Sequence, residues 1–277
     1  MIHVVTEMLS YPFLVRALLG GLMVSLCASL LGVSLVLKRY SMIGDGLSHV
    51  SFGSLSVALA VGWSPLTVSI PVVVLAAFFL LRITENGRMR SDAAIAMISA
   101  SALAIGIIVT SLTPGMTTDV SSYMFGSILA MSRDDVRLAA VLSVIVLGLF
   151  LFCYNKVFAV TFDESFAKAT GVNVSVYNIL IAVLTAVTIV LGMRMMGAML
   201  ISSLIIFPSI TAMRIFKSFG GVVVASGILS VVCFFIGMMF SYVYSTPAGA
   251  SVVVVNLAFF LLFSMFQVIS QHGKKKS

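Results

Sequence analysis

Long apolar runs separated by short polar connections dominate this chain. The runs are about 18 to 25 residues long, which is the length a helix needs to cross the hydrocarbon core of a bilayer. Their side chains do not alternate between apolar and polar as in a transmembrane β-strand. Because only helices and closed barrels satisfy every backbone polar group in a bilayer, the pattern predicts an all-α, polytopic membrane protein.

The predicted spans end at glycine, proline or charged residues. They cover residues 13–37, 43–62, 65–82, 92–112, 136–154, 176–193, 197–213, 221–244 and 250–270. We expect about eight or nine transmembrane helices, eight if the sixth and seventh form one broken unit. The shorter segment Tyr123–Met131 is expected to be re-entrant or interfacial, and residues 155–175 a hydrophilic loop. No connection is long enough for a soluble domain, so residues 1–277 are expected to form a single transmembrane domain.

Composition supports this class and adds an orientation. Of the residues, 61% are hydrophobic and 9% are charged, whereas soluble domains have about 25% charged residues. The net charge of +7 sits in short connections, so it indicates control of topology rather than nucleic-acid binding. The basic residues expected on the cytoplasmic side are Lys38, Arg39, Arg82, Arg88, Arg90, Lys156, Lys168, Arg214, Lys217 and Lys274–Lys276. This places the C-terminus inside and the N-terminus outside.

Two classes of chemistry are missing from the sequence. Cys27, Cys153 and Cys233 stand singly, with no spacing for a metal site or a disulfide framework, so they are expected to be small core residues. There is no Gly-x-x-x-x-Gly-Lys-Ser/Thr phosphate loop and no nucleophile with its base. The chain is therefore not expected to be an enzyme, and any ATP hydrolysis must belong to another polypeptide.

The candidate chemistry lies in the stretch RYSMIGDGLSHVSFG, residues 39–53. Asp45 and His49 are four residues apart, so a helix places both on one face. Counted along a helix from Lys38–Arg39, His49 would lie about 15 Å deeper, near the middle of a ~30 Å hydrocarbon core. An ionisable residue at that depth is a functional candidate by default.

Carboxylate and imidazole are both ligands of first-row divalent metals. One Asp45/His49 pair supplies two ligands, and two copies across a two-fold axis would supply a set compatible with tetrahedral coordination. Spacing alone leaves two other interpretations open. The pair would serve as a polar contact between helices, or it would relay protons in a secondary transporter.

Small residues line the same predicted helix. They are Gly44, Gly46, Ser48, Ser51, Gly53, Ser54 and Ser56. Such residues permit close helix packing, and they also permit a narrow polar path. The sequence does not separate these two interpretations.

Residues 39–53 closely resemble the second-helix motif of the ABC-3 permeases, which are the membrane subunits of bacterial zinc and manganese ABC importers. The resemblance continues in the family's order over nearly the whole chain. It runs through residues 91–106, 119–129, Phe162–Asp163, Gly171, 197–212 and 245–249.

The resemblance implies a homodimer in the bacterial plasma membrane, with cytoplasmic ATPase subunits and an extracellular metal-binding protein as partners. Asp45 and His49 match the Asp and His that line the family's metal path. The implied fold resembles a reduced vitamin-B12-type importer permease, and by that likeness Pro208–Gly220 would contact the ATPase, in preference to residues 162–171. No permanently bound cofactor is implied.

Residues 47–51 and 123–129 resemble zinc members of the family slightly more than manganese members, so the resemblance implies zinc, then manganese, then iron. The chemistry does not separate the three, because an Asp/His shell accepts all of them. The alternative function is a stand-alone, proton-coupled metal transporter. A third interpretation is a membrane scaffold subunit without transport activity.

Overall fold

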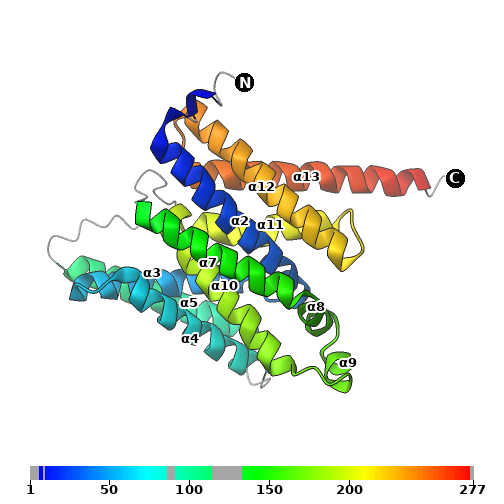
Figure 1. The fold of residues 1–277 in the computed structure, drawn as a ribbon, viewed down its shortest axis with the longest axis horizontal. Helices are drawn as coiled ribbons and strands as arrows, with labels where there is room; N and C mark the ends of the chain where they lie inside the picture. The colour runs from blue at the N-terminus through cyan, green and yellow to red at the C-terminus, as the bar shows by residue number, and fades with distance from the viewer. Residues whose placement is uncertain (1–5, 9, 86–90, 114–132, 275–277) are drawn as a thin grey trace.

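The computed structural model describes residues 6–8, 10–85, 91–113 and 133–274, and every element that it describes there is helical. The elements are α2 (Pro12–Leu37), α3 (Ile43–Val61), α4 (Pro65–Glu85), α5 (Ser91–Leu112), α7 (Arg133–Phe152), α8 (Tyr154–Phe162), α9 (Glu164–Ala169), α10 (Val174–Met196), α11 (Ala198–Met213), α12 (Phe219–Tyr244) and α13 (Ala248–Lys274). Figure 1 shows α2, α7, α10 and α12 along one diagonal of the view, with α3, α4 and α5 grouped beside them. The all-α fold class is confirmed.

Local sequence explains where several helices begin and end. Gly62 ends α3 in the left-handed conformation (φ 76°), which glycine adopts without steric strain. The Asn173 side chain caps α10 by accepting a hydrogen bond from Val176 N–H, and Ser218 caps α12 through Gly221 N–H. These boundaries therefore follow from capping chemistry within a few residues.

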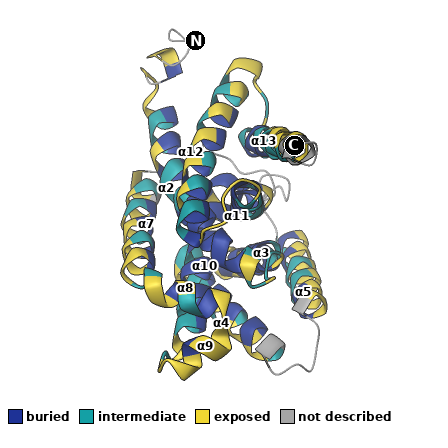
Figure 2. Cartoon of the chain, turned by 90° about the vertical axis from the view of Figure 1, so that its right-hand side faces the viewer, coloured by how far each residue is buried: buried dark blue, intermediate teal, exposed yellow. Residues whose placement is uncertain are grey.

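The core lies around α2, α10 and α11, where buried residues concentrate in Figure 2. In the most apolar 18-residue stretch of each helix, 72% of α2 is buried, against 17% of α5 and 11% of α13. In Figure 1, α13 extends away from the other helices toward the C-terminus. Because α5 and α13 expose apolar side chains along most of their length, these faces suit lipid or another protein rather than water.

The expected number of spans is too high. Among the described residues, six helices are long and apolar enough to cross a membrane, or seven if α7 and α8 count as one bent span. Helix α11 has only 16 residues, a length of about 24 Å against a hydrocarbon core of about 30 Å. Helix α3 is long enough at 19 residues, but its glycines, its serines, Asp45 and His49 lower its mean hydropathy. Both were counted as spans because they continue the apolar pattern of the chain.

The expected loop at residues 155–175 is also wrong. It contains α8 and α9, and the axis bends by 69° where α7 meets α8 at Cys153. Val157 and Val160 are buried, and the rings of Phe158 and Phe219 lie 5.1 Å apart, so α8 packs against the start of α12. The segment Tyr123–Met131 lies outside the described residues.

The structure places Lys38, one of the expected cytoplasmic cations, beside the first residue of α9. Lys38, at the end of α2, pairs with Glu164, the first residue of α9. Tyr154 of α8 contacts Phe219 at the start of α12, with ring centroids 5.5 Å apart. Helix α8 therefore lies against the start of α12, and the end of α2 lies against α9. That these contacts lie on the cytoplasmic side stays a prediction.

Candidate metal-binding site

A tight turn, residues 38–42, joins α2 to α3 and sets where the candidate site begins. Arg39 has a left-handed backbone (φ 62°), and Tyr40 N–H donates to Leu35 O at 2.8 Å, as in a Schellman helix end. The chain becomes helical again at Ile43. The turn therefore separates α2 and α3 into two helices with different directions.

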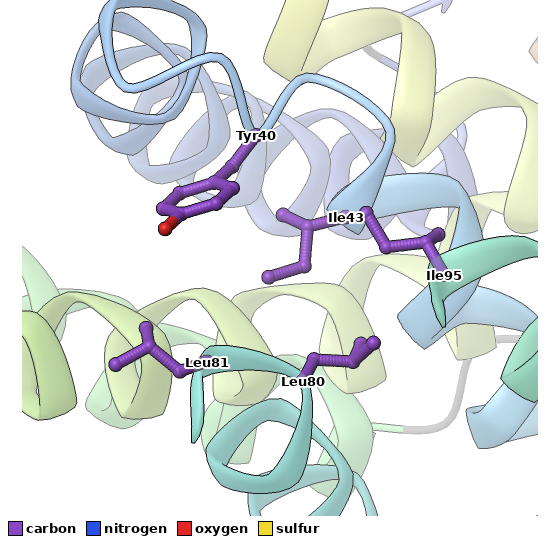
Figure 3. Close-up of a pocket in the computed structure, with 5 residues that line it drawn as sticks. All are labelled: Tyr40, Ile43, Leu80, Leu81 and Ile95. Carbon is purple, nitrogen blue, oxygen red and sulfur yellow. The ribbon is translucent and has the colours of Figure 1, made fainter. Parts of the chain in front are cut away.

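Apolar contacts hold this turn against α4 and α5. Figure 3 shows Tyr40 and Ile43 around a narrow cavity that is also lined by Leu80 and Leu81 of α4 and Ile95 of α5. Because the lining is almost wholly apolar, it favours a dry, packed contact over a ligand site. The contact fixes the first turn of α3.

Two glycines allow α3 to begin between its neighbours. A Cβ at Gly44 would lie 2.9 Å from Ile205 Cδ1 of α11, and a Cβ at Gly46 would lie 2.6 Å from Ile95 Cγ2 of α5. Asp45 stands between them, and its side chain remains 44% exposed. Because α5 and α11 cover the two flanking faces, the carboxylate is left on the open side of the helix.

The predicted pair is brought together. His49 Nε2 lies 3.6 Å from Asp45 Oδ2, and the His49 side chain is 15% exposed. This separation is longer than that of a good hydrogen bond. Two ligands of one tetrahedral ion, each bound at about 2.1 Å, are about 3.4 Å apart. The observed distance is close to this ligand-to-ligand spacing.

The straight-helix count that gave the expected depth of His49 differs from the structure, and the depth in the bilayer stays a prediction. The count gave about 15 Å from Lys38–Arg39 as though the chain were helical throughout. Since the 38–42 turn is not helical, the count begins at Ile43, and His49 lies about 9 Å along the α3 axis from there.

The pair is an incomplete metal site by itself. Within residues 6–8, 10–85, 91–113 and 133–274, no group of three or more His, Cys, Asp or Glu side chains could hold a metal ion. A metal ion held by Asp45 and His49 would therefore need further ligands from outside the described side chains, and the open side of Asp45 is where they could approach.

The small residues of α3 are buried, which favours the packing interpretation over a polar path. All seven of them are in contact with the rest of the bundle. A Cβ at Gly53 would lie 2.6 Å from Ala102 O of α5, and one at Gly106 would lie 2.5 Å from Phe52 Cε1 of α3. Helices α3 and α5 thus approach closely enough to exclude side chains at these positions.

A polar cluster at the end of α2 was not anticipated. Lys38 Nζ donates to Glu164 Oε1 at 2.7 Å and to Asn178 Oδ1 at 2.5 Å, and Asn178 Nδ2 donates to Glu164 Oε1 at 3.2 Å. Sequence analysis used Lys38 only as an orientation marker. The available signal was a lone amide, Asn178, inside an apolar run.

The cysteines are where their surroundings predicted. Cys27 and Cys233 are buried, Cys153 is partly buried at the α7–α8 bend, and all three are free thiols. Their interpretation as small core residues is confirmed for the two buried ones.

Known proteins resemble this chain along almost its full length. The zinc uptake system membrane protein ZnuB of Haemophilus influenzae is 28% identical over 257 residues, which cover 93% of this chain and 98% of ZnuB. The manganese transport system membrane protein MntC of Halalkalibacterium halodurans is 26% identical over 260 residues, covering 94% and 89% of the two chains.

The fold also matches a solved structure. One chain of PsaBC from Streptococcus pneumoniae, solved in complex with Fab, superposes with a TM-score of 0.85 at 28% identity and covers 95% of both chains. The model of the ABC 3 transport family matches residues 10–267, which include α2 to α12 and most of α13. With its helical architecture and this match, the chain belongs to the ABC 3 transport family.

Proposed function

We propose that this chain is the membrane permease subunit of an ATP-driven importer of divalent metal ions. The observation that carries the proposal is the Asp45/His49 pair, spaced for one small cation and open on one side, in a chain whose relatives are named for zinc and manganese transport. The whole chain forms one permease domain, and it does not hydrolyse ATP itself.

The metal ion is cargo that rests transiently on the pair. Two protein ligands bind an ion more weakly than the four of a structural site, and a transport site must release its ion. The exposed carboxylate of Asp45 would bind the ion first. The less exposed imidazole of His49 would then bind as the second ligand.

A second copy of the chain would supply the missing ligands. With two copies facing each other across a two-fold axis, two Asp45 oxygens and two His49 nitrogens surround one ion. The exposure of Asp45 supports this arrangement, because a carboxylate facing its own helix bundle could not reach a partner subunit.

Zinc is the proposed ion, followed by manganese and then iron. The 3.6 Å spacing suits the tetrahedral geometry that zinc prefers. Imidazole and carboxylate also bind manganese and iron, so availability contributes to the choice.

The cytoplasmic ATPase would dock on a segment that is exposed and separate from the bundle. Pro208–Met213, the first half of the segment expected from the resemblance, is the end of α11 and mostly buried, which leaves only Arg214–Ser218 exposed. Helix α9 is a separate short helix, with Phe166 63% exposed. We therefore propose α9 as the main docking element in place of Pro208–Gly220.

The remaining partners follow from the orientation. With the C-terminus in the cytoplasm, the starts of α2 and α7 face outward. An extracellular metal-binding protein would deliver the ion on that side. Membership of the ABC 3 transport family gives no support to the stand-alone, proton-coupled transporter, and we do not propose it.

Uptake measured in liposomes tests the site. The permease is co-purified with its ATPase and supplied with Zn²⁺ on the metal-binding protein. Asp45→Asn and His49→Ala should each lower Zn²⁺ uptake more than about tenfold, since even outer-shell partners of a metal matter that much. In the same assay, the degree to which Mn²⁺ and Fe²⁺ each inhibit Zn²⁺ uptake ranks the three ions by preference.

Asp134→Asn is the matched control, because Asp134 is 91% exposed at the start of α7 and distant in sequence from the site. Its uptake should equal that of the wild type. Normal uptake by both Asp45→Asn and His49→Ala would refute the site, and uptake without any ATPase would refute the importer.

A further inference from the structure

Three polar side chains from three segments form a closed cluster beside the α2–α3 turn. Lys38 caps the end of α2, Glu164 opens α9, and Asn178 lies in the second turn of α10. Each side chain contacts the other two, at the distances given above. Its Lys38 side chain is only 7% exposed. We call these residues the Lys38 cluster.

The burial of Lys38 sets it apart from the other basic residues expected on this side, most of which are exposed. Taking Lys38 out of water is unfavourable unless an anion and good acceptors replace the solvent. Glu164 supplies the charge and Asn178 a carbonyl oxygen. Burial opposes ionisation of Glu164, but the hydrogen bond and charge of Lys38 outweigh it and lower the pKa of this carboxyl. The Glu164 carboxylate is therefore ionised near neutral pH.

Helix α9 has a small hydrophobic core of its own. Val160 of α8, Ala167 of α9 and Val174 of α10 form a cluster that is separate from the main one. The body of α9 therefore does not share the core that holds α2 and α3. Lys38 joins this separate unit to the end of α2.

The link leads directly into the candidate metal site. The 38–42 turn follows Lys38 and is closed by the hydrogen bond from Tyr40 N–H to Leu35 O. Ile43 then starts α3, and Asp45 lies in its first turn. Because the turn is short and hydrogen-bonded, it absorbs little of a displacement of Lys38. Most of that displacement would therefore reach α3.

We propose that Lys38, Glu164 and Asn178 are positioning residues that carry movement of α9 to the Asp45/His49 pair. When the ATPase shifts α9, Glu164 moves Lys38 and the turn with it, and α3 changes the opening beside Asp45. This inference rests on the proposed function, with the ATPase on α9. It assigns to the cluster a role in coupling ATP hydrolysis to ion movement.

The alternative is a purely structural role, in which the Lys38 cluster only stabilises the fold. Buried ion pairs are often replaced by neutral groups without loss of stability, whereas removal of one partner leaves an uncompensated charge. The variant Lys38→Met/Glu164→Gln removes both charges together. Its new amide can still exchange hydrogen bonds with Asn178, so the variant separates coupling from stability.

The experiment measures Zn²⁺ uptake and ATP hydrolysis together in liposomes that contain the permease–ATPase complex and the Zn²⁺-loaded binding protein. We expect Lys38→Met/Glu164→Gln to assemble and melt like the wild type. The ratio of ions imported to ATP hydrolysed should fall about tenfold, within the range of known coupling between sites. Glu164→Gln, which keeps an acceptor for Lys38, should give an intermediate ratio.

The control is Arg137→Gln/Asp134→Asn, which removes an exposed pair at the opposite end of α7, with 79% and 91% exposed side chains. Its ratio should stay at the wild-type value. A wild-type ratio in Lys38→Met/Glu164→Gln overturns the inference. So does a ratio that is unchanged in Glu164→Gln while its melting temperature falls. Absence of uptake by the wild-type complex instead refutes the proposed function, and the two failures are thus distinguishable.

Discussion

Two groups of helices flank α10, and their interfaces are built differently. The bonded group is α2, α11 and α12, and the glycine group is α3, α4 and α5. In the bonded group, serine hydroxyls cross from one helix to the next. Both groups have close backbone approach at glycines, but in the glycine group the hydrogen bonds of Ser48 and Ser54 stay within α3.

The bonded group is joined through backbone carbonyls of α2. Ser226 Oγ donates to Ser29 O at 3.2 Å, and Ser230 Oγ donates to Ser25 O at 2.9 Å. The single proton of Ser209 Oγ is shared between Ser29 O at 3.2 Å and Ile205 O of its own helix at 3.0 Å. Interhelical hydrogen bonds in membranes contribute about 0.6 kcal/mol each on average. Two of these contacts join α12 to α2 and one joins α11 to α2, so α2 sets the register of both neighbours.

The glycine group has hydroxyls of the same type but uses them differently. Ser48 donates to Asp45 O at 2.7 Å and Ser54 donates to Ser51 O at 2.9 Å, both within α3. The hydroxyls of Ser51 and Ser56 are buried without a hydrogen-bond partner. Contact with α5 therefore depends on van der Waals packing.

The difference bears on where the protein can move. Packed helices without cross-helix hydrogen bonds can shear past each other, whereas hydrogen-bonded ones must first break those bonds. Asp45 and His49 belong to the glycine group. The candidate site is therefore on the side of the molecule that is better able to rearrange.

The largest expected effect comes from Gly32→Ala in the bonded group. A Cβ at Gly32 would lie 2.1 Å from Ile205 O, a backbone atom of α11 that cannot rotate away. We expect the free energy of unfolding to fall by about 3 kcal/mol, the upper end for an overpacked core. A thermal melt of the purified protein in detergent measures this.

Gly53→Ala makes the matched change in the glycine group, 2.6 Å from Ala102 O. Because α3 and α5 can shear apart, we expect a smaller loss of about 1 kcal/mol. Gly148→Ala on α7 meets open space and should be neutral or slightly stabilising. Equal losses at Gly32 and Gly53 would remove the distinction between the two groups.

Serine-to-alanine substitutions test the same difference between the two groups through smaller changes in the free energy of unfolding. Ser230→Ala removes a donor from Ser25 O, and we expect a loss of about 0.6 kcal/mol. Ser56→Ala removes a buried hydroxyl that has no partner, so its effect should be zero or stabilising. Opposite signs in the same melting assay would support the two kinds of interface, and a loss in both would contradict them.

The smallest expected effect concerns pH, through the tie between the bonded group and α9. The pKa of Glu164 is lowered from its ordinary value of 4.5, so the Lys38–Glu164 pair stabilises the fold above pH 4.5 and loses that contribution as pH falls. Glu164→Gln should lower the free energy of unfolding by at most about 1 kcal/mol at pH 7, since solvent screens the half-exposed carboxylate.

Melting curves of wild type and Glu164→Gln between pH 7 and pH 4 measure this difference. The gap should narrow toward the acid end and also at high salt. A gap that widens in acid would contradict the assigned sign.

Helix positions were largely predictable from the sequence. The spans expected at 13–37 and 43–62 match α2 and α3 within one residue at each end. A long apolar run in a bilayer has no alternative to a helix, and Gly62 marks where the second one ends. The family assignment was predictable for the same reason, because its motifs are contiguous.

The α8–α9 region and the span count were not predictable in this way. Residues 155–175 are too short and too polar to show a spanning pattern, so their helices depend on packing against α10 and α12. The straight-helix count from Lys38 to His49 did not hold because Arg39 adopts a left-handed backbone, which is uncommon for residues other than glycine.

By itself, the sequence determined the membrane class, most helix boundaries, the one-face placement of Asp45 and His49, and the family. Each of these depends on residues close together along the chain. Only the tertiary structure decided which side of Asp45 stays open, which glycines carry helix contacts, and that Lys38 meets Glu164 from 126 positions away. Those features depend on contacts between distant segments, and no local pattern encodes which distant segment will supply the partner.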